Sequence, residues 1–455
     1  MLEKYFKLSE NHTTVKTEVV AGITTFMTMA YILAVNPSLL GNEFGSNMDA
    51  TAVLIATCLA SFIGTLAMAL LANYPFALAP GMGLNAYFSF TVCGAMGYSW
   101  QVALMAVFIE GLIFIVLSLT NVREAIFDAI PGTLKKGVSA GIGLFIAFIG
   151  LQGAHIVVAN DSTLVSYVDF AGNWNTQGIC AVLALIGLFL TAILYIKGVK
   201  GAILIGILAT WLLGMLAQAV GIYTIDAENG FYSLYPTLGM TDFSAIGKTF
   251  GQCFQADFSN VGIFNFVVIL LSFLFVDMFD TIGTLIGVSS KAGMLDKNDK
   301  LPRVKPALLA DAIATSAGAI FGTSTTTTFV ESSAGVGEGA RTGLASVVTG
   351  FLFLLAIFFA PIFTAIPGFA TAPALIFVGF LMVSAILGID FEDAVEAVPA
   401  YLCMIAMPLM YSISEGIAIG VISYVVIHVA CKKSKRITPL MYVLAVLFVC
   451  KYIFL

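Results

Sequence analysis

Apolar runs long enough to cross a bilayer follow one another along most of this chain, and they limit its fold more than any motif does. A transmembrane helix needs about 20 mostly apolar residues. Twelve such runs can be traced between residues 18 and 429, and only 10% of the 455 residues are charged, compared with about 25% in soluble domains. The sequence therefore predicts an all-α polytopic membrane protein.

Basic residues mark one side of these runs. Lys and Arg gather in connections such as 291–305 and 432–436, whereas the long segments 155–176 and 221–260 carry a single Lys between them. Short loops rich in Lys and Arg stay on the cytoplasmic side. Residues 1–17 are polar and do not resemble a removable signal peptide. We expect a multi-pass protein of the cell membrane with a cytoplasmic N-terminus.

The sequence gives no sign of a metal, an organic cofactor or a nucleic acid as partner. The seven Cys residues are scattered, mostly through apolar runs, without CxxC or Cys/His spacing, and the net charge of −6 gives no support to nucleic acid binding. We therefore expect buried, unpaired thiols, no cofactor, and membrane lipid as the surrounding partner.

Two stretches interrupt the apolar pattern, YPFALAPGMGLNAYFSF from Tyr74 and GTSTTTTFVESSAGVGEG from Gly322. Pro75 and Pro80 break a helix, and TSTTTTF is rich in β-branched residues that favour extended backbone. Non-helical backbone survives at membrane depth only where it is buried in protein or lines a polar cavity. Interrupted segments in corresponding halves mark the substrate site of many transporters. We therefore predict two short extended strands, each followed by a half-helix, at a substrate site.

A short repeat supports two related halves. The tetrapeptide AIPG occurs at 129–132 and again at 365–368, a separation of 236 residues, and the two interrupted stretches place Asn85 and Glu331 246 residues apart. Each AIPG precedes an apolar run. The first tetrapeptide lies on the predicted inside of the membrane and the second on the predicted outside. This pattern favours inverted repeats.

The segment FVDMFDTIGTLIG places two carboxylates at membrane depth. Asp277, Asp280, Thr281 and Thr284 follow the i, i+3, i+4, i+7 spacing of one helical stripe. A charge at the bilayer centre costs roughly 2.5–3.5 kcal/mol on insertion scales, so such residues normally face a protein interior and mark a pathway. Asp277 is the favoured site residue and proton-coupling group, with Asp280 as the next candidate, although either could instead bond only to neighbouring backbone or hydroxyls.

Glu331 and Asn85 begin the two predicted half-helices. An ionised Glu331 at a helix N-terminus is favoured by unpaired N–H groups, and it can accept hydrogen bonds from ring N–H groups. The alternative is a plain cap, a role that Ser332 or Thr328 could also fill. The amide of Asn85 both donates and accepts, which suits a purine edge, although on its own it could be a turn residue.

Longer motifs resemble one transporter family. The stretches AGITTFMTMAYILAVNP, APGMGLNAYF, FVDMFDTIGTLIGV, LLADAIATSAGAIFGTSTTTTFVESSAGV and RTGL are similar to the adenine/guanine/hypoxanthine permease branch of the nucleobase transporters, and the resemblance runs from about Phe6 to the C-terminus. The sequence departs from the family where Glu338 and Ala340 stand beside Arg341, in place of paired glycines.

The resemblance implies a fold of about fourteen transmembrane segments in two inverted repeats of seven, usually as a homodimer. It implies a cytoplasmic segment (1–17), a core domain (18–120 and 263–364) that moves against a gate domain (121–262 and 365–455), and proton-coupled uptake of purine bases, hypoxanthine and guanine first and adenine next. It also implies that Glu331 is the family's substrate-binding Glu, and it favours Gly83 and Asn85 as site residues. Asp277, Phe329 and Ser332 complete the set that we expect to contact the substrate.

Other intramembrane polar residues are expected to support the site or the packing. Thr281 and Asp311 are candidate supporting residues, while Asp311 and Glu110 also suit bonds between facing helices. Phe88 or Phe329 could cover a flat base, although core packing accounts for either one. The lone His155 and His428 fit interfacial positions, and the acidic turn 392–396 fits a solvated face.

Four alternatives belong to other classes or substrates. An anion transporter of the same architecture would want Lys or Arg near the half-helices, and neither Asn85 nor Glu331 has one nearby in sequence. An intramembrane aspartyl protease would pair acids from two helices, whereas Asp277 and Asp280 share one. A uracil or xanthine carrier, or a channel, stays open.

Overall fold

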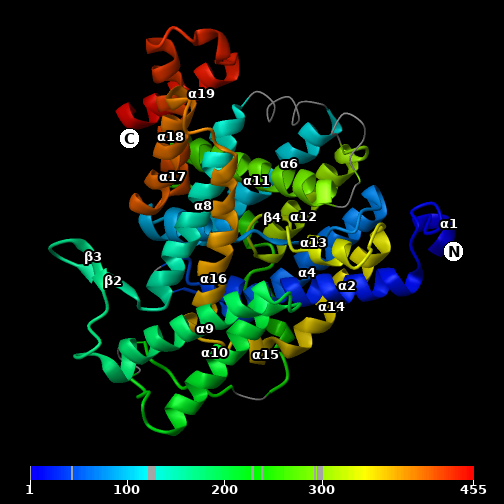
Figure 1. Cartoon of the computed structure of the whole chain (residues 1–455), viewed down its shortest axis with the longest axis vertical. Helices are drawn as coiled ribbons and strands as arrows, with labels where there is room; N and C mark the ends of the chain where they lie inside the picture. The colour runs from blue at the N-terminus through cyan, green and yellow to red at the C-terminus, as the bar shows by residue number, and fades with distance from the viewer. Residues whose placement is uncertain are drawn as a thin grey trace.

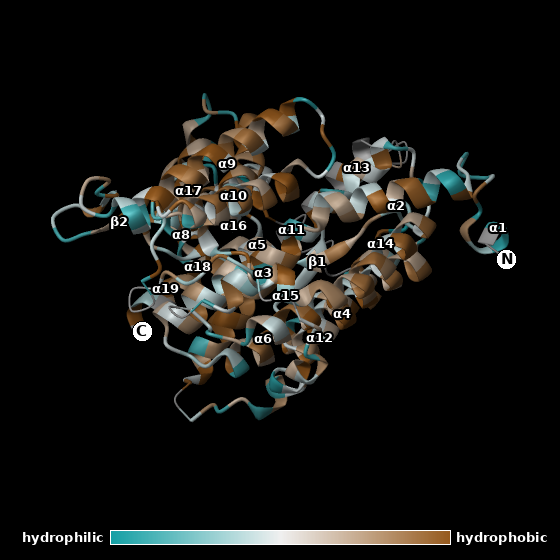
Figure 2. Ribbon diagram, turned by 90° about the horizontal axis from the view of Figure 1, so that it is seen from below, coloured by the Kyte–Doolittle hydropathy of each residue, from teal (hydrophilic) through white to brown (hydrophobic). Residues whose placement is uncertain are grey.

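The computed structural model describes residues 2–42, 45–120, 130–226, 230–236, 239–259, 261–291, 294 and 301–454. The chain is mainly helical, and its helices fall into two groups by their mutual contacts (Figure 1). Apolar residues cover most of the helices, whereas the N-terminal end is more hydrophilic (Figure 2). A hairpin of β2 (Val157–Asn160) and β3 (Leu164–Tyr167) projects from the helices (Figure 1).

The first group, here named the site bundle, surrounds the two interrupted stretches. Within it α12 packs against α4 and α6, and α14 packs against α2 and α4. Its helices are α2 (Val15–Met29), α3 (Ile32–Leu40), α4 (Ala50–Ala67), α5 (Met82–Ala86), α6 (Trp100–Leu119), α11 (Ile263–Lys291), α12 (Val304–Phe321), α13 (Ser332–Gly337) and α14 (Gly343–Ala356).

The second group, here named the outer bundle, lies on the opposite flank in Figure 1. In this group α8 packs against α16 and α17, and α9 packs against α10 and α16. Its helices are α8 (Gly132–Gly153), α9 (Ile179–Ile196), α10 (Ala202–Ala219), α16 (Gly368–Val383), α17 (Ala394–Leu409) and α18 (Ile413–Ala430).

The two predicted strands are present and pair with each other. β1 (Leu78–Pro80) and β4 (Thr326–Thr328) run antiparallel, with Ala79 opposite Thr327. The N–H of Gly81 donates to the carbonyl of Thr325 at 3.0 Å, and that of Phe329 donates to the carbonyl of Ala77 at 3.0 Å. These bonds satisfy backbone groups that neither lipid nor a helix could pair.

Helix lengths confirm a polytopic membrane protein. The described residues include 11 helices that are long and apolar enough to cross a bilayer, and α17 together with residues 439–450 adds two shorter apolar helices. The twelve predicted runs correspond to these 11 helices and α17. The C-terminal tail forms a further helix, α19 (Pro439–Phe454). The count of fourteen and the inverted repeats stay predictions.

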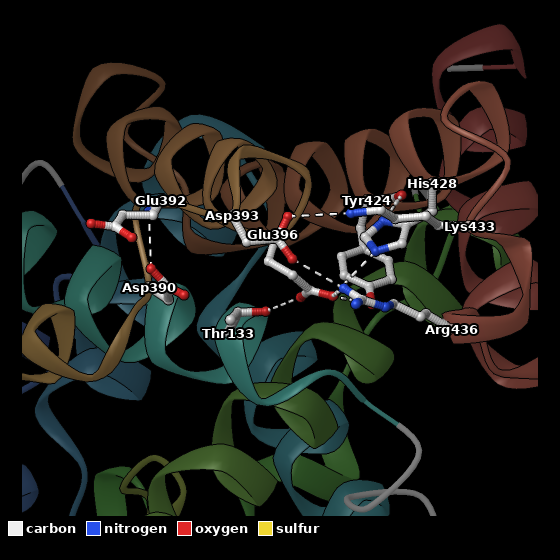
Figure 3. A network of polar contacts seen from close by, with 9 residues as sticks. All are labelled: Thr133, Asp390, Glu392, Asp393, Glu396, Tyr424, His428, Lys433 and Arg436. Atoms are coloured by element: carbon white, nitrogen blue, oxygen red, sulfur yellow. Dashed lines mark hydrogen bonds and ion pairs between the residues drawn. The ribbon is translucent and has the colours of Figure 1, made fainter.

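The acidic turn at the start of α17 corrects one expectation. Glu396 is no solvated residue, because its side chain is 16% exposed and accepts hydrogen bonds from Thr133 at 2.5 Å and Tyr424 at 3.2 Å (Figure 3). Asp393 lies 3.1 Å from Arg436 and 3.4 Å from Lys433. These contacts join α8, α17, α18 and the loop before α19.

His428 corrects a second expectation. Its side chain is fully buried inside α18 rather than at an interface. One ring nitrogen lies 2.9 Å from the carbonyl oxygen of Tyr424 and the other lies 3.2 Å from Glu396 Oε1 (Figure 3). The position near the end of an apolar run gave no sign of this pairing, because the partner carboxylate comes from another helix. The Cys residues behave as expected: the described ones are free thiols, and most are buried.

Candidate functional site

The paired strands bring the candidate residues together at the centre of the site bundle. α5 begins two residues after β1, α13 begins four residues after β4, and α11 contacts β4, α5 and α13. Short strands followed directly by helices let residues from two distant stretches share one location. The site thus combines side chains from α2–α3, α11, the strands and α13.

Glu331 lies just before α13 and is half-buried. Its side chain caps no backbone N–H of α13, so the plain-cap interpretation is wrong. Instead, Oε1 accepts a hydrogen bond from the hydroxyl of Tyr31 at 2.6 Å. A length near 2.6 Å is typical of a hydroxyl bound to a carboxylate. Glu331 therefore has one fixed oxygen and further acceptor positions for another group.

Asp280 is the second half-buried carboxylate. Its Oδ2 accepts from Thr327 at 3.4 Å, and a Cβ on Gly81 would lie 3.4 Å from the same oxygen. Asp280 is near enough to Glu331 and Asp311 to interact with both electrostatically. The described surroundings of Asp280 and Glu331 thus supply carboxylates and hydroxyls, which suit a ligand with N–H donors.

Asp277 lies deeper and has different partners. It is fully buried, as are Thr281 and Asp311. The hydroxyl of Thr281 lies 2.8 Å from Asp277 Oδ1 and 2.9 Å from Asp311 Oδ1. A hydroxyl carries one hydrogen and can donate fully to only one of two carboxylates. Both contacts are satisfied when one of the two acids is protonated and donates to the Thr281 oxygen.

Asn85 is fully buried, and its Oδ1 accepts a hydrogen bond from Ser324. Its Nδ2 has no hydrogen-bond partner within the described part of the chain. An unpaired buried amide donor costs roughly 1–3 kcal/mol. Asn85 therefore carries an amide donor that has no partner among the described residues.

Three other predicted site residues have structural partners. The Oγ of Ser332 accepts the N–H of Ala77 at 3.0 Å, which ties α13 to β1. A Cβ on Gly83 would lie 2.7 Å from Ile142 Cγ2, so this glycine allows close contact between α5 and α8. Phe329 is 6% exposed and packs in the core.

Two further residues, Glu110 and Tyr31, hold parts of the site through hydrogen bonds. Glu110 of α6 accepts a hydrogen bond from Thr325 at 2.8 Å, so it fixes the segment that leads into β4. Tyr31 was not singled out by sequence reasoning. The available signal was its hydroxyl inside the otherwise apolar stretch MAYILAV, but apolar runs often bury a Tyr, so the sequence alone could not assign its partner.

Known sequences similar to this chain are transporters. Residues 16–419 match a family model described as "Permease family". The adenine permease AdeP of Escherichia coli is 42% identical over all of this chain and 96% of its own length. The guanine/hypoxanthine permease PbuO of Bacillus subtilis is 46% identical over 97% of this chain and 98% of its own length.

Among solved structures, the fold is similar to the transmembrane domain of the cyanobacterial bicarbonate transporter BicA. The TM-score is 0.62 at 15% sequence identity, and the match covers 89% of this chain and 97% of that domain. At this identity the likeness concerns the fold alone.

Proposed function

Because this chain belongs to the permease family, in its adenine, guanine and hypoxanthine branch, we propose that it takes up purine nucleobases across the cell membrane. The observation that supports this function best is the pair of half-buried carboxylates, Asp280 and Glu331, beside the joined strands. A multi-pass membrane protein with these groups at its centre can hold a polar base away from lipid.

The proposed binding mode uses complementary donors and acceptors. Ring N–H groups of the purine donate to Glu331 and Asp280, and the Nδ2 of Asn85, which has no partner among the described residues, donates to a ring nitrogen or exocyclic oxygen. Hypoxanthine and guanine both present such a mixed edge, and adenine presents a different one. We favour hypoxanthine and guanine as substrates, with adenine next.

The proposed coupling ion is a proton, held by the buried pair Asp277 and Asp311. The two contacts of Thr281 support one proton on this pair, as its single hydroxyl hydrogen cannot satisfy two carboxylates. This assigns the coupling role to Asp277 together with Asp311, and it moves Asp280 from the coupling role to the base. This assignment is supported by burial, because Asp277 is fully buried whereas Asp280 is half-buried.

Alternating access is proposed to move the site bundle against the outer bundle, in an elevator-like manner. The site bundle then corresponds to the core domain and the outer bundle to the gate domain. A homodimer, inverted repeats and a cytoplasmic N-terminus belong to the same proposal. In this proposal the close contact between α5 and α8 at Gly83 forms part of the surface along which the two bundles slide.

Uptake by the purified protein in proteoliposomes tests the function. We expect radiolabelled hypoxanthine to accumulate when the pH is lower outside, and a protonophore to abolish accumulation. Unlabelled guanine, adenine, xanthine, uracil and bicarbonate are added as competitors in separate assays. Competition by uracil or bicarbonate, but not by guanine or hypoxanthine, would overturn the proposal, and equilibration without accumulation would overturn proton coupling.

A further inference from the structure

Tyr31 stands where the first membrane span changes its helical geometry. Residues 15–40 form one continuous apolar span, but Ala30 and Tyr31 join α2 to α3 with ψ angles of −16° and −25°. Such values are closer to a 3₁₀ turn than to an α-helix. Tightened turns inside a helix often mark functional positions. Here the turn places Tyr31 opposite α13.

The position of Glu331 relative to Tyr31 is fixed by tight packing. A Cβ on Gly335 of α13 would lie 2.1 Å from Thr25 Oγ1 and 2.7 Å from the carbonyl oxygen of Ala21, so α2 and α13 approach as closely as their backbones allow. Tyr31 itself is fully buried. The bond from its hydroxyl to Glu331 therefore joins two elements that cannot easily separate.

We propose that Tyr31 is a positioning residue of the base site, and that its hydroxyl holds the Glu331 carboxylate in the orientation that receives the purine. This inference rests on the proposed function. The 2.6 Å bond occupies Oε1 and leaves Oε2 to a ring N–H. A fixed carboxylate also loses less side-chain entropy on binding than a mobile one.

The inferred role differs from simple packing. The ring of Tyr31 lies in the apolar core, and a Phe would fill the same space. The hydroxyl is the only polar part of this side chain, and it donates to the half-buried carboxylate of Glu331. Its removal should thus alter binding more than folding. Among the described residues, Asp280 of α11 also interacts electrostatically with this carboxylate.

The test compares Tyr31→Phe with a matched variant in the same protein. Tyr424 is also buried and also donates to a glutamate, Glu396 at 3.2 Å, but it lies in α18. Hypoxanthine affinity is measured on the purified full-length proteins between about pH 5 and pH 8, with thermal unfolding recorded for each. We expect Tyr31→Phe to bind hypoxanthine about tenfold more weakly at pH 7, because it lacks one hydrogen bond to a charged group. Tyr424→Phe should bind like wild type.

Two further readouts separate positioning from packing. A carboxylate that has lost a donor is protonated more easily, so binding by Tyr31→Phe should decline at a higher pH than in wild type. In a Glu331→Gln background, Tyr31→Phe should change affinity less than about twofold, because the two residues act as a unit.

The remaining outcomes would overturn either the positioning role of Tyr31 or the proposed base site. Wild-type affinity and pH profile in Tyr31→Phe, or an additive effect with Glu331→Gln, would overturn the positioning role. Failure of Tyr31→Phe to fold would also overturn it, because the hydroxyl would then serve stability. Unchanged affinity in Glu331→Gln alone would instead overturn the proposed base site.

Discussion

Replacing Glu331 with Gln tests the central contact of the proposed site. The change keeps the shape of the side chain but turns one acceptor oxygen into a donor and removes the charge. The hydroxyl of Tyr31 can still donate to the remaining oxygen, so α13 should stay in place. The loss then falls on the purine contact. A hydrogen bond to a charged group contributes about 1.5–3 kcal/mol, which corresponds to roughly 10- to 150-fold weaker binding.

Equilibrium binding of labelled hypoxanthine to purified protein measures this effect without transport. Glu392→Gln is the matched control, because Glu392 is exposed before α17 and makes the same change of charge away from the strands. We expect this control to bind like wild type. Glu331→Gln protein that unfolds at the wild-type temperature and binds hypoxanthine within about twofold of wild type would refute the reasoning, since that change is well below the roughly 1.5–3 kcal/mol of a hydrogen bond to a charged group.

Three more predictions follow from the structure. Asp277→Asn and Asp311→Asn should each keep base exchange but lose accumulation driven by a pH gradient in proteoliposomes. Accumulation equal to wild type in either variant would show that the replaced residue does not hold the coupling proton. Gly83→Ala should lower the unfolding temperature, because its Cβ would lie 2.7 Å from a side-chain carbon of α8, and overpacking costs typically 1–3 kcal/mol; an unchanged temperature would contradict this. Hydrogen bonding to Arg436 lowers the pKa of Asp393, so the ionised Asp393 stabilises the fold at neutral pH. This contribution disappears as the pH falls below about 4, the usual pKa of an Asp. The unfolding temperatures of wild type and Asp393→Asn should therefore converge at such low pH.

The interrupted stretches were the most predictable part of the fold. Pro80 and the threonines before Glu331 forbid or disfavour a helix, and membrane depth forbids unpaired backbone, so extended segments that pair with something were required. Their pairing with each other, β1 with β4, confirms that argument. The register, with Ala79 opposite Thr327, depends on how distant helices pack and could not be derived from the sequence.

The division of tasks among the carboxylates was less predictable. The helical spacing predicts that Asp277 and Asp280 lie near one face of α11, but it does not say which of them lies beside β4 and which contacts α12. The position of α12 decides it, since Asp311 and Thr281 enclose Asp277. The same limit explains Tyr31 and His428, whose partners lie 300 and 32 residues away.

In the proposed mechanism, α11 links the base to the proton over one helical turn. A proton on the Asp277 and Asp311 pair removes a negative charge beside Asp280, which helps Asp280 stay ionised and accept a ring N–H. Base bound at Asp280 favours the proton by the same factor, because linkage between two binding sites is reciprocal. Loss of that proton at high pH should weaken base binding, and protonation of Glu331 at low pH should weaken it again. Two opposite limbs of one pH profile would thus report separately on the buried pair and on the carboxylate that Tyr31 holds.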